Sequence, residues 1–576
     1  MSKILRKLQL SLLLLCLAQP LAAAPMRPTH AQHVMVASVH ELASQAGVET
    51  LKAGGNAVDA AVAVGFALAV VHPQAGNLGG GGFMLLRQSD GALHFIDYRE
   101  KAPAKATEKM YLDASGNAIP QLSRIGYKSI AVPGSVAGMV FAQKKFGKLR
   151  LEQVIAPAIK LARDGFPLAY EDAESLKDPE LNKFDESRRI FQRDGKYYQA
   201  DEVLKQPDLA LTLQRIAKDP DDFYHGQMAR DLAAVIQKGG GLITAEDLAS
   251  YEVKERKVIH GTYRGYDVYS APPPSSGGVA LIEILNILEG YDLAKLGNRS
   301  AASMHLTIEA FRRAYFDRAE FMGDPDFANI PVAQLIDKRY GEAWREGLDP
   351  HRATLSADLK RPAVFNQLER YATLHPQPAV GVEPEHTTHY SVVDAEGNAV
   401  SVTTTLNDSL GSRVTAEGLG FLLNDEMDDF AAAPGKPNLY GLVQGPANAV
   451  SSNKRPLSSM TPTIVTRDGK LFLVLGSPGG GTITTIVANV LMGVIDYGMN
   501  IQEAVNAPRF HNQWMPDEIR LEKGFSPDTV HLLEHMGHKI DLHNYWGDAE
   551  CIAIDPQSRE LLGASDARHN GRALGY

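Results

Sequence analysis

Thr387 is the residue whose setting best suits nucleophilic chemistry. It follows His386 at the end of a proline-containing segment (residues 375–386) and begins a run rich in Thr, Val and Tyr. If the chain is cut between His386 and Thr387, the new amino group can act as general base for the threonine hydroxyl. The alternative is an ordinary half-buried β-hairpin in which threonine is simply a good strand former. Taken by itself, the segment favours this alternative.

Two consecutive glycines, Gly479 and Gly480, stand between a predicted strand and a predicted helix. Consecutive backbone N–H groups at a helix N-terminus bind anions, which suits the oxyanion of a tetrahedral intermediate. A tight strand-to-helix turn explains the same residues equally well. A phosphate loop is disfavoured because Thr482 and Thr484 follow without a lysine.

An acidic segment (residues 424–430) and Arg99 offer opposite charges to a small zwitterionic group. Carboxylates of the segment can pair with an ammonium group, and Arg99 can hold a carboxylate with two hydrogen bonds. Ser458 and Ser459 can add hydroxyl donors. Each feature has an ordinary alternative: a solvated acidic loop, a surface arginine and a capped turn. A calcium loop is disfavoured because the segment lacks the glycine of an EF-hand.

A competing motif, His531, Glu534 and His535, matches the H-x-x-E-H pattern of a family of zinc peptidases. Helical spacing places both histidines on one face. The helix is short, however, and a third ligand must come from Glu550 or Glu560, with little chain left to build a cleft. We therefore disfavour zinc.

The composition is that of a globular protein large enough for one composite core or several domains, with 576 residues, 44% hydrophobic and 22% charged. The net charge of −10 argues against a nucleic-acid-binding surface. Three basic residues, an apolar run at 8–17 and small residues at 22–24 predict a cleaved export signal over residues 1–24. Cys16 leaves with it, so Cys551 has no partner for a disulfide.

Periodicity and turn residues predict an α+β fold of two antiparallel sheets covered by helical layers. Strand hairpins are expected at 387–405, 83–98 and 463–475, with a further strand at 421–424. The segment 353–386 has the composition of a linker. Helices are expected at 36–53, 57–71, 135–146, 151–163, 227–237, 279–288, 301–321 and 482–495.

Taken together, these features resemble the γ-glutamyltransferase (γ-glutamyltranspeptidase) family of N-terminal-nucleophile hydrolases, in its bacterial exported form. The motifs that carry the resemblance are residues 54–61, 77–82, 98–103, 387–391, 424–430, 455–460 and 476–480. The resemblance implies a four-layer αββα sandwich, one composite domain built from two subunits after self-cleavage. The large subunit would be residues 25–386 and the small, catalytic subunit residues 387–576.

The resemblance also assigns roles to individual residues. It implies that Thr387 is the nucleophile in both self-cleavage and catalysis, and that Thr405 orients it. The remaining positions match the oxyanion donors (Gly479 and Gly480), the α-carboxylate site (Arg99, Ser458 and Ser459) and the α-amino site (Asn407, Glu426 and Asp429).

The implied reaction cleaves the γ-glutamyl bond of glutathione and related compounds through a threonine acyl-enzyme, with water, amino acids or dipeptides as acceptors. No metal or cofactor is required. The two subunits would form a heterodimer in the periplasm or outside the cell, without a stable membrane anchor and without nucleic acid. A segment at 434–445, with Tyr440, resembles the lid loop of some members.

Two positions depart from the family pattern or vary within it. Leu410 stands where Phe or Tyr is usual, so packing near Asn407 is expected to differ. Glu426 is Gln in some bacterial relatives, which would tune affinity for the ammonium group.

Three alternatives remain. A glutaryl- or cephalosporin-type acylase would not need the ammonium site. A zinc peptidase would lose activity with a chelator and would depend on His531. A non-catalytic periplasmic binding protein would stay uncut, and it would not need Thr387, Thr405 and the glycine pair.

Overall fold

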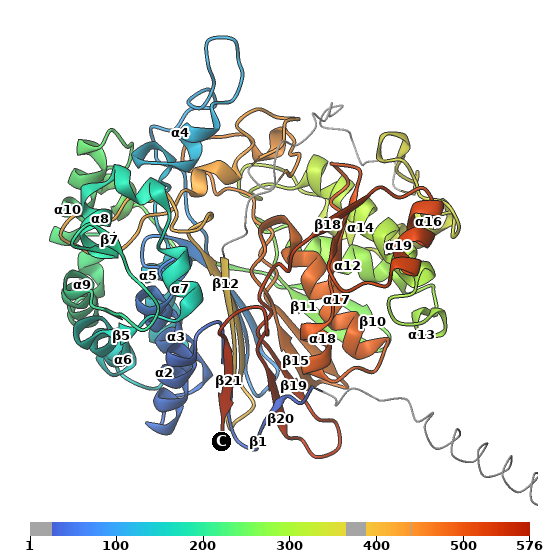
Figure 1. Ribbon diagram of the computed structural model, residues 1–576, viewed down its shortest axis with the longest axis horizontal. Helices are drawn as coiled ribbons and strands as arrows, with labels where there is room; N and C mark the ends of the chain where they lie inside the picture. The colour runs from blue at the N-terminus through green and yellow to red at the C-terminus, as the bar shows by residue number, and fades with distance from the viewer. Residues whose placement is uncertain (1–25, 365–386, 439–440) are drawn as a thin grey trace, which may run out of the picture.

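The computed structural model describes residues 26–364, 387–438 and 441–576. The predicted export signal (1–24), His386 and Tyr440 lie outside these residues. Two seven-stranded sheets form the centre of the molecule, and helices cover the outer face of each (Figure 1). The α+β, four-layer αββα prediction is therefore confirmed.

One sheet, which we term the nucleophile sheet, contains the hairpin that begins at Thr387. All seven of its strands are joined in antiparallel pairs, which extend along both sides of this hairpin. In spatial order the strands are β21 (Arg572–Gly575), β2 (Met35–Ser38), β12 (Thr387–Val393), β13 (Ala399–Thr405), β3 (Gly81–Arg87), β4 (Leu93–Tyr98) and β9 (Lys254–Arg256).

The other sheet, which we term the oxyanion sheet, carries the glycine pair after one of its central strands. In spatial order its strands are β1 (Thr29–Ala31), β20 (Leu561–Ala564), β19 (Cys551–Ile554), β15 (Lys470–Leu475), β14 (Thr463–Arg467), β11 (Tyr266–Ser270) and β10 (Ile259–Tyr263). Both sheets thus combine strands from before and after residue 387.

Helices on the outer face of the nucleophile sheet come from the first half of the chain. They include α2 (Glu41–Lys52), α3 (Ala57–Val71), α5 (Ser135–Phe146), α6 (Leu151–Asp164), α7 (Tyr170–Ser175), α8 (Asp185–Phe191), α9 (Pro207–Lys218), α10 (Gln227–Lys238) and α11 (Ala245–Ala249). The central helix α3 is buried along its whole length, and Asn56 caps its first turn.

Helices on the outer face of the oxyanion sheet come from both halves. They are α12 (Gly277–Leu288), α13 (Leu293–Leu296), α14 (Ala301–Phe321), α15 (Val332–Leu335), α16 (Lys338–Glu346), α17 (Ile483–Ile495), α18 (Ile501–Asn506) and α19 (Pro527–His535). Beside them lies a small sheet of β16 (Phe510–His511), β17 (Ile519–Glu522) and β18 (Ile540–His543). No helix within the described ranges is long and apolar enough to cross a membrane.

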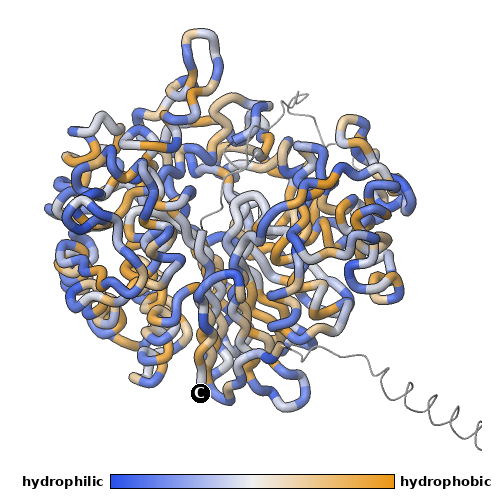
Figure 2. Tube along the Cα trace, in the orientation of Figure 1, coloured by the Kyte–Doolittle hydropathy of each residue, from blue (hydrophilic) through white to orange (hydrophobic). Residues whose placement is uncertain are grey.

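Successive side chains of a strand point to opposite faces of the sheet, so the strands divide the core into layers. On β3, Met84 and Leu86 pack under the helices, whereas Phe83 and Leu85 pack between the two sheets. A third apolar layer joins the oxyanion sheet to its own helices. Apolar stretches accordingly gather on the strands and the helices beside them, and hydrophilic stretches follow the outer loops (Figure 2).

Two predicted elements are wrong. Residues 35–38 form β2 rather than the start of a helix, because they pair with residues 390–393 of β12, and α2 begins only at Glu41. Residues 421–424 form isolated bridges rather than a strand. Gly418 and Gly420 there have positive φ, and the side chain of Asn424 bonds to the carbonyls of Gly79 and Ala131 in place of a ladder.

The glycine-rich loop that leads into β3 allows close packing. A Cβ on Gly80 would lie 2.1 Å from the carbonyl oxygen of Thr405, and one on Gly82 would lie 2.5 Å from that of Thr403. The backbone of β3 therefore sits directly against the strand that carries Thr405. The one described cysteine, Cys551, is buried and unbridged.

Candidate active site

Thr387 begins β12 and lies opposite Thr405, the last residue of β13. The two hydroxyl oxygens are 3.1 Å apart, and both side chains are buried. The backbone N–H of Asn407 donates to Oγ1 of Thr405 at 2.9 Å and so fixes the position of that hydroxyl. A central strand pair thus holds the candidate nucleophile against a second hydroxyl.

The side chain of Thr387 points into the space between the two sheets. Alternate residues of a strand share a face, and on this face Ser391 donates to the carbonyl of Glu550, which adjoins β19 of the other sheet (2.8 Å). β2 pairs with β12 only from Tyr390 onward. Thr387 therefore extends beyond the end of its neighbouring strand, where the loop after β15 can reach it.

His389 is the nearest histidine along the strand, but its setting is structural. Its ring nitrogens lie against the hydroxyls of Thr403 (2.9 Å) and Ser391 (3.2 Å). Burial lowers the pKa of His389 to about 3, so the ring is neutral at ordinary pH. A base for Thr387 must come from elsewhere, and an amino group on Thr387 itself meets that need.

Gly479 and Gly480 form the turn between β15 and α17. Both have positive φ, 140° and 49°, which L-residues with side chains rarely adopt. The carbonyl of Gly479 accepts hydrogen bonds from the backbone and hydroxyl of Thr482, both at 2.8 Å. A short 3₁₀ turn, Gly480–Thr482, then leads into α17. Gly480 borders the cavity beside Thr387; Gly479 does not.

Arg99 stands at the end of β4 with its side chain fully buried. Its guanidinium pairs with the carboxylates of Glu426 and Asp429 and donates to the carbonyls of Pro456 and Leu457, both at 3.2 Å. Burial alone would lower the pKa of Arg99, but Glu426 and Asp429 outweigh it and raise the pKa above its ordinary value. The sequence analysis assigned Arg99 to the carboxylate of a zwitterionic group, and Glu426 and Asp429 to its ammonium group. In the structure these residues contact one another directly.

The other predicted binding residues surround this ion cluster. Asn407 has a left-handed backbone (φ 81°), and its amide donates to the carbonyl of Asp425 at 3.1 Å. The hydroxyl of Ser458 accepts from the backbone of Met460 (3.1 Å), and that of Ser459 accepts from Arg318 (3.1 Å). Leu410 is fully buried and does not border the cavity.

One small cavity, about 20 Å³, brings these groups together. The paired side chains of Arg99, Glu426 and Asp429 occupy much of the space around it. The residues that line it are Arg99, Arg318, Thr387, Thr405, Asn407, Glu426, Asp429, Leu442, Leu457, Ser458, Ser459, Met460, Gly480 and Ile483. Every predicted site residue that the structure describes, apart from Gly479, is among them.

Five of these lining residues were not singled out from the sequence. Arg318 lies in a helix whose many charges are typical of a solvent-exposed face, although the helix is almost wholly buried. Leu442 belongs to the predicted lid segment. Leu457, Met460 and Ile483 are apolar neighbours of predicted residues and carry no chemical signal of their own.

A buried acid, Glu100, adjoins the ion cluster, 3.5 Å from Arg99. Burial raises the pKa of Glu100 to about 7 from an ordinary value of 4.5. Since the folded protein binds this proton more tightly than the unfolded chain, the contribution of Glu100 to stability is fully present below pH 4.5. It is lost as the pH rises through 7.

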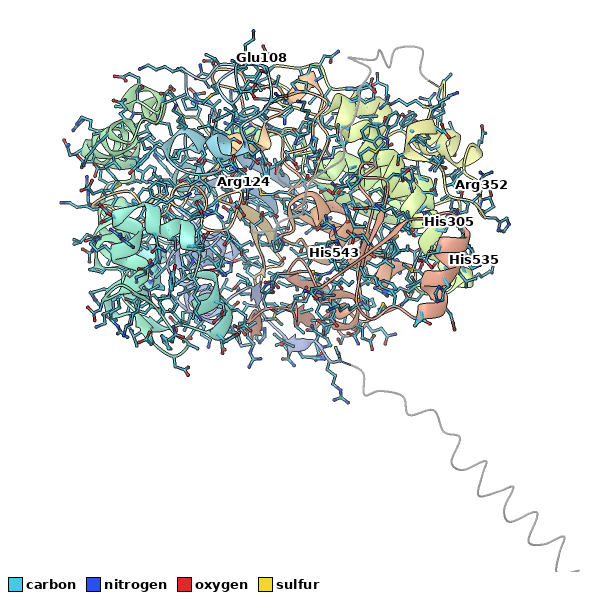
Figure 3. The ribbon with its side chains drawn as sticks, turned by 45° about the horizontal axis from the view of Figure 1, so that its top comes forward. Glu108, Arg124, His305, Arg352, His535 and His543 are labelled. Atoms are coloured by element: carbon cyan, nitrogen blue, oxygen red, sulfur yellow. The ribbon has the colours of Figure 1, made fainter. Side chains whose placement is uncertain are left out.

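We therefore expect Glu100→Gln, which stays neutral, to flatten the pH dependence of stability. Between pH 5 and 8 the wild-type protein should lose on the order of 3 kcal/mol more than the variant, measured by calorimetric unfolding. Glu108→Gln alters an exposed glutamate (Figure 3) and should keep the wild-type profile. Superimposable profiles for wild type and Glu100→Gln would contradict the assignment.

The H-x-x-E-H motif does not form a ligand cluster in the described chain. On α19 the ring of His531 lies 3.1 Å from Glu534, and both side chains are largely exposed. The ring of His535 lies 2.7 Å from the carbonyl of His531, and this histidine sits at the rim of the molecule (Figure 3). The motif is a surface helix.

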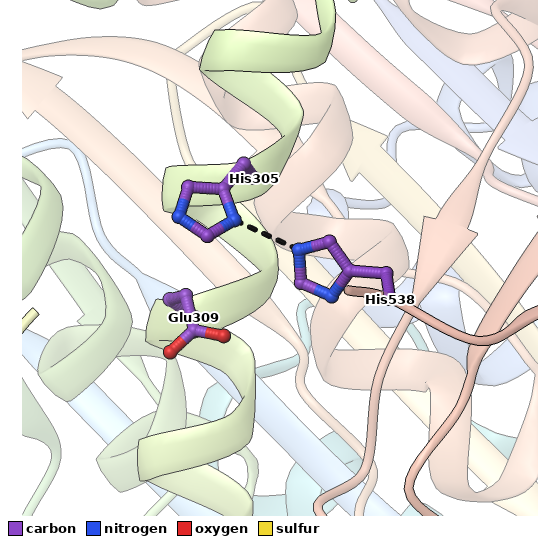
Figure 4. Close-up of side chains that lie close together, drawn as sticks. All are labelled: His305, Glu309 and His538. Atoms are coloured by element: carbon purple, nitrogen blue, oxygen red, sulfur yellow. Dashed lines mark hydrogen bonds between the residues drawn. The ribbon is translucent and has the colours of Figure 1, made fainter. Parts of the chain in front are cut away.

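A different group, His305, Glu309 and His538, brings three potential ligand atoms within 4.8 Å (Figure 4). The histidine rings lie 2.8 Å apart, and His305 also contacts the carbonyl of Asp349 at 2.8 Å. Glu309 is already held by Arg312 (3.3 Å) and Arg313 (2.6 Å). Two guanidiniums beside the one carboxylate disfavour a divalent cation, so the group instead ties α14 to the chain after α19.

Several known proteins are similar to this chain. The gamma-glutamyltranspeptidase family model matches residues 43–576. A glutathione hydrolase proenzyme of Escherichia coli K12 is 50% identical over 545 residues, 94% of this chain and 91% of that protein. The structure of a cephalosporin acylase from Bacillus halodurans aligns with a TM-score of 0.83 at 27% identity, covering 97% and 98% of the two chains. A Helicobacter pylori gamma-glutamyltranspeptidase structure aligns with a TM-score of 0.57 at 45% identity, covering 60% of this chain and 99% of that one.

Proposed function

This chain belongs to the gamma-glutamyltranspeptidase family, as its motifs indicated, and from that premise we propose that it is a self-processing glutathione hydrolase. It cleaves γ-glutamyl bonds of glutathione and related compounds and passes the glutamyl group to water, amino acids or dipeptides. The observation that carries the proposal is the pairing of the Thr387 and Thr405 hydroxyls beside the Arg99, Glu426 and Asp429 cluster.

Self-cleavage begins when Oγ1 of Thr387 attacks the carbonyl carbon of His386. The peptide C–N bond breaks as the ester C–O bond forms, and the hydroxyl proton passes to the nitrogen of Thr387. Water then hydrolyses the ester, which leaves a carboxylate on His386 and a free amine on Thr387. Thr405 supports this step because its hydroxyl lies 3.1 Å from the attacking oxygen.

In catalysis the new amine takes the proton from Oγ1 of Thr387, and the oxygen attacks the γ-carbonyl carbon of the donor. Backbone N–H groups at Gly479 and Gly480 stabilise the oxyanion. The leaving amine takes the proton from the Thr387 ammonium group, and an acyl ester remains. Water or an acceptor amine then attacks that ester, so the kinetics are ping-pong.

Donor recognition uses both signs of charge in the cluster. The α-ammonium group binds Asn407, Glu426 and Asp429, and the α-carboxylate binds Arg99, Ser458 and Ser459. Because Arg99 already pairs with Glu426 and Asp429, the two charged groups of the donor replace a protein ion pair rather than fill an unpaired site. This exchange favours a zwitterion, since either charge alone leaves one buried group unpaired.

The cut at His386–Thr387 yields subunits 25–386 and 387–576 that stay associated without a covalent bond. In the nucleophile sheet, β12 from the small subunit lies directly between β2 and β13, and β13 pairs with β3. In the oxyanion sheet, β11 pairs with β14. Separating the subunits would break both sheets, so a stable heterodimer follows.

Two further features complete the proposal. Residues 1–24 direct export, and the mature protein works in the periplasm or outside the cell.

The segment 434–445 acts as a lid: Asn438 and Leu442 pair through their backbones at 3.0 Å, and Leu442 borders the cavity. A lid excludes water from the acyl-enzyme and limits bulky groups.

The specific rival is an acylase, because a cephalosporin acylase shares the fold. An acylase for glutaryl groups has no need of Glu426 and Asp429, whose carboxylates suit an α-ammonium group. The test compares γ-glutamyl-p-nitroanilide with glutaryl-p-nitroanilide, which differ only in that ammonium group. We expect the γ-glutamyl compound to have a kcat/KM at least about 100-fold higher.

A dipeptide acceptor such as glycylglycine should give parallel double-reciprocal plots with the γ-glutamyl donor. Equal or faster turnover of the glutaryl compound would favour the acylase and overturn the proposal.

A further inference from the structure

Arg318 brings a second guanidinium to the cavity wall, from the last turn of α14. Its side chain is buried, with 3% of the residue exposed. The nearest predicted site residue is Ser459, whose hydroxyl accepts a hydrogen bond from Nη2 of Arg318 at 3.1 Å. Nε of Arg318 donates to the hydroxyl of Ser276 at 3.0 Å.

This cation has no counter-ion within the described parts of the chain. Among the described residues, no carboxylate lies within ion-pair distance of Arg318, and its Nη1 is buried without a hydrogen-bond partner. Burial accordingly lowers the pKa of Arg318, although Tyr315 and Asp429 offset part of the effect. A buried charge without a partner is costly, so its retention beside a binding site suggests that an anion completes it.

Arg99 shows the opposite arrangement. Its guanidinium is already matched by Glu426 and Asp429, so the pair of carboxylates balances its charge before any donor binds. Of the two guanidiniums that line the cavity in the described part of the chain, that of Arg318 lacks a counter-ion there. A donor carboxylate that binds near Ser459 can therefore be stabilised by the positive charge of Arg318 in addition to its contacts with Arg99.

We propose that Arg318 is a positioning and specificity residue for the α-carboxylate of the γ-glutamyl donor, acting through Ser459. This inference rests on the proposed function. By donating to Oγ of Ser459, Arg318 leaves the proton of that hydroxyl free to point at the carboxylate and adds a nearby positive charge. The donor class selected is one with a free α-carboxylate, as opposed to an α-carboxamide.

The test measures KM and kcat for two donors, γ-glutamyl-p-nitroanilide and its α-carboxamide, with wild type, Arg318→Met and Arg318→Lys. For Arg318→Met we expect KM of the carboxylate donor to rise about 10- to 100-fold. For the carboxamide we expect a change below about 3-fold. Arg318→Lys keeps the positive charge but lacks the planar guanidinium group, so its KM for the carboxylate donor should lie between those of wild type and Arg318→Met.

The matched control is Arg312→Met. Arg312 lies on the same helix, is equally buried and pairs with Glu309 (3.3 Å) and Asp517. It does not border the cavity. This variant should lower stability while leaving the ratio of kcat/KM for the two donors at the wild-type value.

A double-mutant cycle with Ser459→Ala tests the route of action. If Arg318 works through Ser459, Arg318→Met should have a clearly smaller effect on KM in the Ser459→Ala background. Equal losses for both donors in Arg318→Met, or an unchanged KM for the carboxylate donor, would overturn the inference. Should Arg318→Met fail to mature into two subunits, Arg318→Lys and the cycle built on it decide the question.

Wild-type turnover separates this inference from the function on which it rests. If wild type does not release p-nitroaniline from the γ-glutamyl donor, the proposed function fails. If wild type is active and Arg318→Met keeps the wild-type preference for the carboxylate, only the role of Arg318 fails.

Discussion

Thr387→Ala is expected to yield one uncut chain with at least about a thousandfold less γ-glutamyl hydrolysis than wild type. Alanine lacks the oxygen that attacks His386 and, later, the donor, so both reactions stop together. Denaturing electrophoresis with N-terminal sequencing provides the measurement. Wild type should give two fragments, the smaller beginning Thr-Thr-His-Tyr.

Thr388→Val is the matched control. Thr388 is the next residue, is also buried and lies on the opposite face of β12, and its hydroxyl has no hydrogen-bond partner in the described chain. Valine keeps its shape, so this variant should be cut and active. Two fragments from Thr387→Ala, or an active wild type that stays as one chain, would falsify the mechanism.

Arg99→Met is expected to produce the second large effect. Removing the guanidinium leaves Glu426 and Asp429 as buried carboxylates without their partner, at a cost of about 3–5 kcal/mol in stability. The same change removes the contact that we propose for the α-carboxylate, so KM for γ-glutamyl donors should rise about 100-fold. Thermal unfolding and steady-state kinetics measure the two effects separately.

Arg312→Met again provides the comparison. It breaks a buried ion pair on α14, away from the cavity, and should lower stability with little effect on KM. A wild-type KM in Arg99→Met would show that this arginine stabilises the fold without binding the donor.

Local signals sufficed for much of the fold. The helix predicted at 301–321 matches α14 from Ala301 to Phe321, and the hairpin at 387–405 matches β12 and β13. Ser300 caps the first turn of α14, and residues 394–398 form the turn of the hairpin. β2 was missed because its strand conformation depends on pairing with residues 390–393, more than 350 positions away. No local pattern records such a partner.

The candidate site likewise contains some residues that the sequence indicates and others that it does not. The residue types at Thr387, Gly480 and Arg99 signal their chemistry, and family motifs point to the same positions. The direct contact between Arg99 and Glu426 could not be predicted, because the packing of β4 against the loop at 424–430 sets it. Arg318 carried no signal at all: a charged residue on a charged helix is expected to face water, and only the assembled layers bury it.

The alternation of strands from the two subunits also sets how the mature enzyme responds to denaturation. Before the cut, β12 finds its place between β2 and β13 as part of one chain, and folding is unimolecular. After the cut, refolding becomes a second-order encounter that lacks the millimolar effective concentration a short tether provides. We therefore expect the recovery of denatured mature enzyme to depend on protein concentration, whereas that of the uncut Thr387→Ala precursor should not. The lifetime of the processed enzyme is therefore set by its rate of unfolding, because unfolded subunits rarely reassemble.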